Sequence, residues 1–343
     1  MRRRIASAIA LAVVSAGAAR AQSPSNLGLR GSIVSAESQQ PLGFSIVTLH
    51  PGGAGQFTDA AGAFAFTDAR PGTYLLSVRQ IGYAPLDTQV VIGAHEPVMR
   101  IALRRLAIEL PPVTITPNPC TKPGRPDSSD AALRAVFDQL QENARRFELL
   151  ADSYPFRYTL EIADRAVNQR GDTGRPMVRN LEFSSRHVPS YAVGGVVGPS
   201  YPPWDPGSLV IETGGPEYFV NPSFVANHCF HLVGRDVIAG EPLVRVDFEP
   251  SARLWSADLS GAAFLDSLTY ELRYIEVALT HPERTELDGV RSMNARTKFR
   301  NIAPAVPLQD SMVAVTTYRF RRDSRVQTQR TLNVRFLRRR PAP

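Results

Sequence analysis

Short runs in which apolar and polar residues alternate dominate the chain, and turn residues separate them. Such a run predicts a strand with one buried face. Between residues 28 and 104, roughly seven of these runs follow one another at the spacing typical of a sandwich. Thr58–Gly62 and Pro71-Gly72 are turn sequences, because Asp bonds the nearby backbone and Gly tolerates a positive φ. This region therefore predicts a seven-stranded antiparallel β-sandwich.

One later segment follows the helical period instead. Its apolar residues repeat at intervals of three and four and form one face: Leu133, Val136, Phe137, Leu140, Ala144, Phe147 and Leu150. Ser128 or Ser129 is the predicted N-cap, and Asp130 suits the positive end of the helix. Pro155 predicts an end near Ser153. We expect this helix to pack on the sheet that follows.

The rest of the chain returns to the alternating pattern of strands. The predicted strands begin at Phe156 and continue at 179–185, 208–212, 243–248, 260–265, 270–279, 294–300, 312–320 and 330–337. Alternation with one polar face is typical of an antiparallel sheet that is open to water on one side. The predicted fold class is mainly β: an N-terminal seven-stranded antiparallel β-sandwich, then a curved antiparallel sheet packed with one long helix (α+β).

The N-terminus has the three parts of a secretory signal peptide. Arginines precede an apolar run from Ile5 to Val14, and Ala19-Arg20-Ala21 has the small-x-small form of a cleavage site before Gln22. A retained anchor is the alternative, but the run is short for a membrane span. We expect an exported protein of the periplasm or cell envelope, with outer-membrane association as one option.

Proline-rich sequence at 117–127 marks a domain boundary. The predicted parts are the signal peptide (1–21), a short lead (22–27), the sandwich (28–104), a Pro-rich linker (105–127) and a helix-plus-sheet domain (128–343).

The charge balance changes once the signal peptide is removed. The chain carries 39 basic and 32 acidic residues, and four of the arginines lie in residues 1–21, so the mature balance is 35 − 32 = +3. Such a small excess gives no support to nucleic-acid binding. No later run reaches the ~18 apolar residues of a membrane helix. Association with a membrane surface is compatible with the sequence, whereas a helical span is not.

The two cysteines, Cys120 and Cys229, are an even count, which favours a disulfide in an oxidising compartment. Two buried thiols are the alternative. His228-Cys229-x-His231 is the one dense group of metal-type ligands, but its spacing matches no usual zinc pair. A bridged Cys229 would leave two ligands where zinc needs three or four. His228 and His231 are therefore weak metal candidates, and we expect no cofactor.

A glycine-rich stretch leads into a stiff loop in which Tyr201 and Trp204 lie among four prolines. Such aromatic residues can form a stacking platform for a sugar or a peptide, and they are the candidate ligand-binding residues. Packing of the loop against the sheet edge is the alternative. Asp258 and Asp266 lie eight residues apart around a turn and suggest paired carboxylates, with solvated turn acids as the alternative.

Several motifs of the first domain occur together in a characteristic order. They are Gly31-x-Ile33-Val34, Gln40-Pro41-Leu42, Thr58-Asp59-x-x-Gly62-x-Phe64-x-Phe66, Pro71-Gly72-x-Tyr74-x-Leu76-x-Val78 and Ile81-Gly82-Tyr83. In this order they resemble the carboxypeptidase regulatory-like domain, a transthyretin-like sandwich found at the front of bacterial envelope proteins. The resemblance implies a structural or binding module without catalytic residues. Asp59 and Tyr83 are accordingly expected to be turn and core residues.

The second domain has looser resemblances. The meander from Leu243 to Ile275 is similar to the curved half-barrel sheets of periplasmic lipoprotein carriers. The domain as a whole is similar to uncharacterised exported bacterial proteins, and their paired cysteines support a bridge between Cys120 and Cys229. Neither resemblance implies an active site.

The functional prediction is a non-enzymatic exported cell-envelope protein, a structural or binding module whose partner is an envelope protein, a lipid or a glycan. No nucleophile elbow and no His-Glu-x-x-His motif occurs in the sequence. The alternatives are a periplasmic hydrolase with carboxylate chemistry and a small outer-membrane β-barrel, whose strand number the sequence permits.

Overall fold

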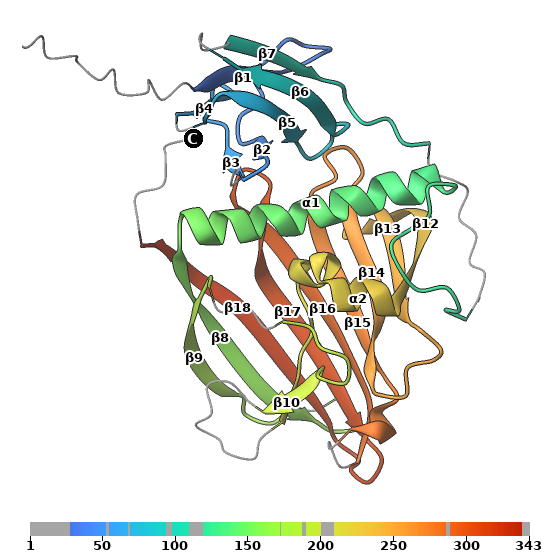
Figure 1. Ribbon diagram of the computed structural model, residues 1–343. Helices are drawn as coiled ribbons and strands as arrows, with labels where there is room; N and C mark the ends of the chain where they lie inside the picture. Colours follow the sequence, from blue (N-terminus) through green and yellow to red (C-terminus); the bar gives the residue numbers. More distant parts are fainter. Residues whose placement is uncertain are drawn as a thin grey trace, which may run out of the picture.

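The computed structural model describes residues 28–52, 55–67, 69–93, 98–109, 119–171, 173–186, 190–199, 209–285 and 289–337. Ala21, Gln22, Tyr201 and Trp204 lie outside the described residues. Figure 1 shows a small β-sandwich at one end, a long helix beneath it, and a large sheet that extends away from both.

The sandwich contains two sheets with a shared core. Its strands are β1 (Leu29–Ser35), β2 (Ile46–His50), β3 (Gln56–Phe57), β4 (Ala63–Phe66), β5 (Gly72–Arg79), β6 (Leu86–Ile92) and β7 (Val98–Leu103). They form a three-stranded sheet, β4-β1-β7, and a four-stranded sheet, β3-β2-β5-β6. The seven strands confirm the predicted sandwich. One pair departs from the antiparallel pattern, because β1 and β7 run parallel from Arg30 opposite Val98 to Ser35 opposite Leu103. No hairpin joins these two strands, so no turn sets their relative direction.

The predicted helix is α1 (Ala131–Ser153), and its predicted apolar face is buried. The N-cap differs from the predicted serines. The side chain of Asp130 caps the helix by accepting a hydrogen bond from the backbone N–H of Leu133 at 3.0 Å. Ser129 instead donates its backbone N–H to Asp127, so the serines belong to the turn before the helix.

The second domain is built on one nine-stranded antiparallel sheet, called the large sheet below. Its strands are β8 (Phe156–Val167), β9 (Met177–Ser184), β12 (His228–Ile238), β13 (Glu241–Pro250), β14 (Asp258–Asp266), β15 (Leu272–Thr280), β16 (Val290–Ala303), β17 (Val306–Tyr318) and β18 (Ser324–Phe336). The spatial order is β12-β13-β14-β15-β16-β17-β18-β8-β9. The first strand after α1, β8, therefore lies beside β18, the last strand that the structure describes.

The sequence prediction omitted β12. The alternation of apolar and polar residues along β12 is interrupted at a register shift between Leu232 and Gly234. A search for strict period-two alternation therefore does not detect this strand. Shorter elements complete the domain: β10 (Val197–Pro199), β11 (Leu209–Ile211), the 3-10 helices η1 (Pro216–Val220) and η2 (Pro282–Arg284), and α2 (Pro222–Asn227).

One face of the large sheet forms the main core beneath α1, η1 and α2 (Figure 1). Residues of this core include Phe137, Phe219, Phe230, Val244, Phe248, Leu259, Ile275 and Met312. Because side chains alternate along a strand, their sequence neighbours point to the opposite face, away from α1. None of the described helices is long and apolar enough to cross a membrane.

Helix α1 is buried on both sides, which its single apolar face did not predict. Its polar residues Gln139, Glu142, Asn143 and Arg146 are all below 5% exposed. The sandwich covers the side of the helix that the large sheet leaves open. Gly82 donates its backbone N–H to Gln139 Oε1 at 2.7 Å, so a sandwich motif contacts the helix directly.

Candidate functional site

The face of the large sheet that points away from α1 carries a line of cationic and aromatic side chains. Across neighbouring strands, Arg245 lies opposite Phe264, Phe264 opposite Tyr274, Tyr274 opposite Lys298, and Lys298 opposite Ser311. The Arg245 guanidinium lies 5.7 Å from the Phe264 ring centroid, and the Lys298 ammonium lies 5.8 Å from the Tyr274 ring centroid. Five strands thus align residues that are far apart in the sequence.

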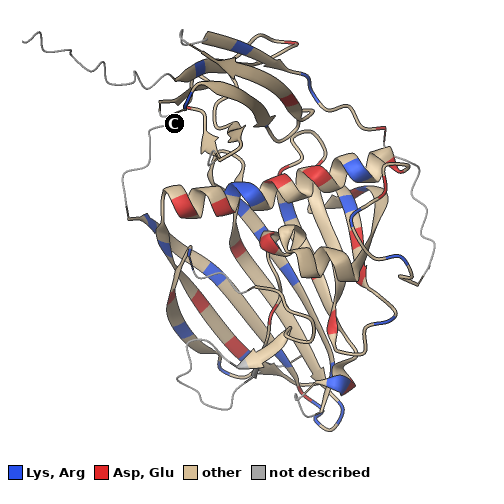
Figure 2. Cartoon of the chain, viewed as in Figure 1, with Lys and Arg blue, Asp and Glu red and all other residues tan. Residues whose placement is uncertain are grey.

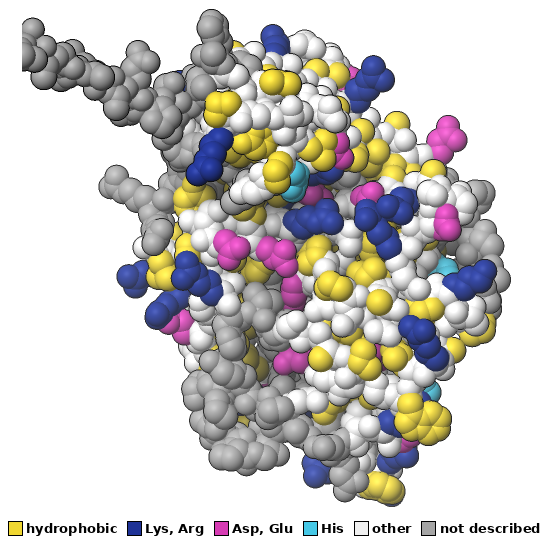
Figure 3. Space-filling view, viewed as in Figure 1, with side chains coloured by type: hydrophobic (Ala, Val, Ile, Leu, Met, Phe, Trp, Pro, Cys, Tyr) yellow, Lys and Arg dark blue, Asp and Glu magenta, His cyan; other side chains and the backbone are white. Residues whose placement is uncertain are grey.

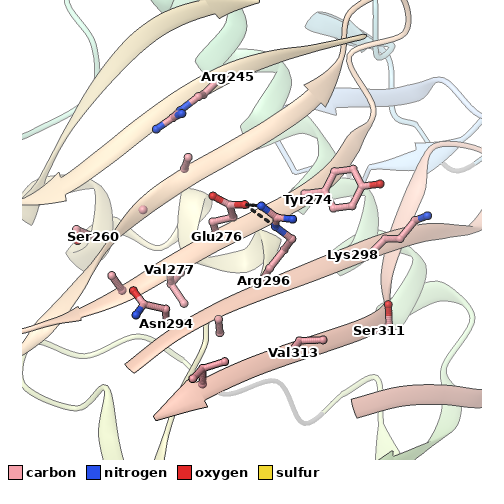
Figure 4. A pocket seen from close by; sticks show the side chains of 15 residues that line it. Arg245, Ser260, Tyr274, Glu276, Val277, Asn294, Arg296, Lys298, Ser311 and Val313 are labelled. Atoms are coloured by element: carbon pink, nitrogen blue, oxygen red, sulfur yellow. Dashed lines mark hydrogen bonds and ion pairs between the residues drawn. The ribbon is translucent and has the colours of Figure 1, made fainter. Parts of the chain in front are cut away.

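This face is hollowed into an open trough of about 700 Å³. Small side chains on two neighbouring strands, at Ser260, Ala262 and Ala278, form part of its lining. Figure 4 shows longer side chains around them, with Glu276 and Arg296 joined across the strands and Tyr274 beside Lys298. The trough therefore combines a floor of small residues with charged groups.

The charges in the trough differ in how far they are neutralised. Arg245 is paired with Asp247 at 2.6 Å and lies 3.6 Å from Asp236. Arg296 is paired with Glu276. Lys298 is exposed, and no described carboxylate lies within 4.0 Å of its ammonium. Lys298 is consequently the cation that can best accept an anionic group from solution.

An apolar strip borders these cations on β17. Val313, which is 47% exposed, lies opposite Arg296, and Val315, which is 36% exposed, lies opposite Asn294. Exposed β-branched side chains next to a cation form a surface for a molecule with an anionic group and an apolar part.

The two histidines of the weak metal prediction do not share a site. His228 is fully buried, with Nδ1 2.8 Å from the Phe224 carbonyl oxygen and Nε2 3.1 Å from the Leu259 carbonyl oxygen. His231 is three positions later on β12, so it lies on the opposite face, exposed and 3.4 Å from Glu249. The described residues contain no group of three metal-type ligands.

The predicted carboxylate pair is also separated, because Asp258 and Asp266 stand at opposite ends of β14. Asp258 is fully buried rather than solvated, and it accepts a hydrogen bond from the Tyr191 hydroxyl at 2.5 Å. Burial raises the pKa of Asp258. Asp266 is a turn acid that accepts the backbone N–H groups of Leu268 and Thr269, each at 2.9 Å.

The structure joins Cys120 and Cys229 in a disulfide with a Cα–Cα distance of 5.5 Å, in agreement with the predicted bridge. Cys229 lies on β12, and Ala252 donates its backbone N–H to the Cys120 carbonyl oxygen at 3.0 Å. The bridge therefore ties the segment before α1 to the edge of the large sheet.

Sequence reasoning missed a group of three acids near α1, of which Glu212 and Glu217 are half-buried and Glu148, on α1 itself, is exposed. Burial raises the pKa of Glu217, on η1, to about 7. It also raises the pKa of Glu212 and of Glu148. Burial and then the charge of Glu217 raise the pKa of Tyr158 to about 12. No local motif marks these residues, because their environment depends on the folding of η1 against α1.

The trough was missed for a similar reason. Lys298 and Tyr274 stand on different strands, and only the register of β15 against β16 brings them together.

Asp59 and Tyr83 of the first domain were expected to be structural residues, and their contacts agree with that role. Asp59 accepts the backbone N–H of Ala63 at 2.8 Å within a turn, and Tyr83 packs against the sandwich core.

Comparison with known proteins gives a family for the first domain. Residues 29–115 match the model of the CarboxypepD_reg-like domain. No curated protein matches the chain in sequence.

The chain also has neighbours among solved structures. A putative outer membrane lipoprotein-sorting protein domain from Vibrio parahaemolyticus is 9% identical, with 59% of this chain and 93% of that chain covered and a TM-score of 0.33. A LolA superfamily protein from Nitrosomonas europaea is 9% identical, with 60% and 94% covered and a TM-score of 0.27. A putative membrane-associated protein of unknown function from Bacteroides fragilis is 12% identical, with 90% and 98% covered and a TM-score of 0.20. These scores are too low to carry an argument about function. The family match thus stands for residues 29–115, where the sequence motifs had indicated it.

Proposed function

We propose that the protein is an exported, non-enzymatic binding protein of the cell envelope, and that its trough binds an anionic amphiphile. The observation that carries the proposal is Lys298, an exposed ammonium without a described carboxylate partner. The exposed Val313 is diagonal to it on the neighbouring strand β17, two residues after Ser311, which lies directly opposite Lys298. An anionic head would meet Lys298, while its apolar chain would cover Val313 and Val315. A charge-assisted hydrogen bond and apolar burial would then act on the same molecule.

Export is supported by two features that are independent of each other. The N-terminal segment has the form of a signal peptide, and both cysteines are joined in a disulfide. Disulfides persist mainly in oxidising compartments. Amphiphiles with anionic heads are among the molecules that an envelope protein meets there.

Binding is favoured over catalysis by the composition of the trough. Its acid, Glu276, is paired with Arg296, and Arg245 is paired with Asp247 on its own strand. No histidine or cysteine is among the described residues that line the trough. A hydrolase would need a nucleophile or an activated water beside a base. The sandwich is proposed to act as a structural module that holds α1 against the sheet.

Calorimetric titration tests the proposal, with dodecyl phosphate as the probe and dodecyl maltoside as the uncharged comparison. The chain should begin at Gln22, so that the apolar run Ile5–Val14 cannot bind the probe. We expect dodecyl phosphate to bind and Lys298→Gln to weaken the affinity about tenfold, because one charge-assisted hydrogen bond is lost.

Lys122→Gln is the matched control, since Lys122 is the other lysine of the chain and is also exposed. It should bind dodecyl phosphate like the unmodified protein. Equal affinities for the Lys298→Gln and unmodified proteins would contradict the trough as the binding site.

A further inference from the structure

Three connections between strands lie together at the end of the large sheet that is remote from the sandwich. They join β13 to β14 (251–257), β15 to β16 (of which 281–285 and 289 are described) and β17 to β18 (319–323), and we call these described residues the sheet tip. The opposite end faces the sandwich, because Gly82 of the sandwich lies close to Thr269 in the connection between β14 and β15. In Figure 1 the sheet tip is at the bottom and the sandwich is at the top.

Two aromatic side chains project from the sheet tip. Trp255 is 80% exposed and Phe320 is 84% exposed. Single exposed apolar residues are common on soluble proteins. Here, however, both aromatic residues flank the same central connection, and neither is covered by it.

The central connection links the two aromatic residues. Arg284 donates from Nη1 to the Trp255 carbonyl oxygen at 3.0 Å, and its guanidinium lies 4.1 Å from the Trp255 ring centroid. On the other side, Arg319 donates its backbone N–H to the Gly289 carbonyl oxygen at 2.7 Å, next to Phe320. The two aromatic residues therefore belong to one surface built from three connections.

Positive charge accompanies the aromatic residues. The connection 319–323 contains three arginines and one acid, Asp323. No described carboxylate lies within 4.0 Å of Arg321 or Arg322. In the central connection, Glu283 lies 3.8 Å from the guanidinium groups of both Arg284 and Arg319, so this described acid is engaged with cations other than Arg321 and Arg322. Figure 2 shows basic residues at the lower end of the chain, and Figure 3 shows hydrophobic and basic side chains next to each other there.

We propose that the sheet tip docks on the surface of an anionic lipid bilayer. Aromatic rings settle at the boundary between headgroups and acyl chains, and nearby arginines contact anionic headgroups. Projecting hairpins suit a deformable surface, because separate convex points can each sink into a bilayer. This docking goes beyond ligand binding in the trough and does not depend on it.

Co-sedimentation with vesicles tests the docking surface. Vesicles of 30% phosphatidylglycerol in phosphatidylcholine are compared with pure phosphatidylcholine, using the chain from Gln22. We expect sedimentation with the anionic vesicles alone, and at least tenfold less bound protein for Trp255→Ala/Phe320→Ala. Arg321→Gln/Arg322→Gln should also reduce binding, and added salt should weaken it.

Leu268→Ala is the matched control. Leu268 is 75% exposed but stands in the connection between β14 and β15, at the opposite end of the sheet. Its binding should equal that of the unmodified protein. Equal binding to both vesicle types, absence of binding, or full binding by Trp255→Ala/Phe320→Ala would overturn the proposal.

A second measurement does not depend on the double variant. The chain has two tryptophans, so Trp204→Phe leaves Trp255 as the sole emitter. Brominated phosphatidylglycerol vesicles should quench its fluorescence. Unchanged emission at a saturating lipid concentration would also overturn the docking of this tip.

Discussion

Arg146 of α1 donates from Nη1 to the backbone carbonyl oxygen of Phe44 at 2.6 Å, across the junction between the helix and the sandwich. Arg146 also bonds Gln80 Oε1 and lies 3.7 Å from Glu142 Oε1, and its side chain is 0% exposed. A fully buried guanidinium needs such partners, because burial of an unpaired charge is costly. This one residue therefore couples the sandwich to the helix that packs on the large sheet.

Replacing Arg146 by Met should destabilise the protein strongly. The change leaves the Glu142 carboxyl buried without its cation, for which the expected cost is about 3–5 kcal/mol. Urea denaturation followed by circular dichroism should show the lower midpoint. Arg157→Met is the control, since the pair Arg157–Glu182 has the shorter distance of 2.8 Å but both side chains are more than half exposed. Its effect should stay below about 1 kcal/mol, and equal midpoints for the two variants would refute the role of Arg146.

Glu217→Gln should remove part of the pH dependence of stability. Burial raises the pKa of Glu217 from 4.5 to about 7 in the folded protein, so the folded state retains a proton that the unfolded state has lost. This contribution to stability is complete below about pH 4.5, falls as the pH rises to about 7 and stays low above it. The loss corresponds to at most about 3 kcal/mol.

Thermal melts at pH 4 and pH 8 measure this difference. At pH 8 Glu217→Gln should melt above the unmodified protein, and at pH 4 the two should agree. Glu182→Gln alters a 60% exposed carboxyl and should show no such gain at pH 8. A Glu217→Gln protein that melts with the unmodified protein at both pH values would exclude the raised pKa.

Gly261→Ala should disturb the floor of the trough. A Cβ at this position would collide with the backbone carbonyl oxygen of Glu276, so β14 and β15 would have to separate. We expect a loss of about 2–4 kcal/mol together with weaker binding of dodecyl phosphate. Gly93→Ala is the control, because nothing lies within 4 Å of its Cβ position, and its stability should change by less than about 1 kcal/mol.

Removing the disulfide should lower stability through the unfolded state. Cys120 and Cys229 are 109 residues apart, and the entropy of closing such a loop corresponds to about 5 kcal/mol. Cys120→Ser/Cys229→Ser should therefore melt at a lower temperature than the oxidised protein. A reductant should bring the unmodified protein to the same temperature and leave the variant unchanged. A reductant effect on the variant would contradict this assignment.

Local patterns predicted most of the elements but not their surroundings. The residues Leu133 to Leu150 repeat with the helical period, and that spacing alone determined which face of α1 meets the large sheet. The burial of Arg146 on the other face was not predictable, because it depends on where the sandwich docks. The burial of Asp258 was not predictable for the same reason. An acid at a solvated turn and an acid buried by tertiary packing can have the same local sequence.

The sequence by itself determined the strands and the helix, the sandwich with its family motifs, and the even cysteine count behind the bridge. These features depend on residues that are close in the chain or on composition, so period and turn chemistry suffice. Only the tertiary structure decided that Lys298 lies beside Tyr274 and near Val313, and that Trp255 and Phe320 flank one connection. The physical reason is that register between strands, and the docking of one domain on another, depend on long-range packing that no local pattern encodes.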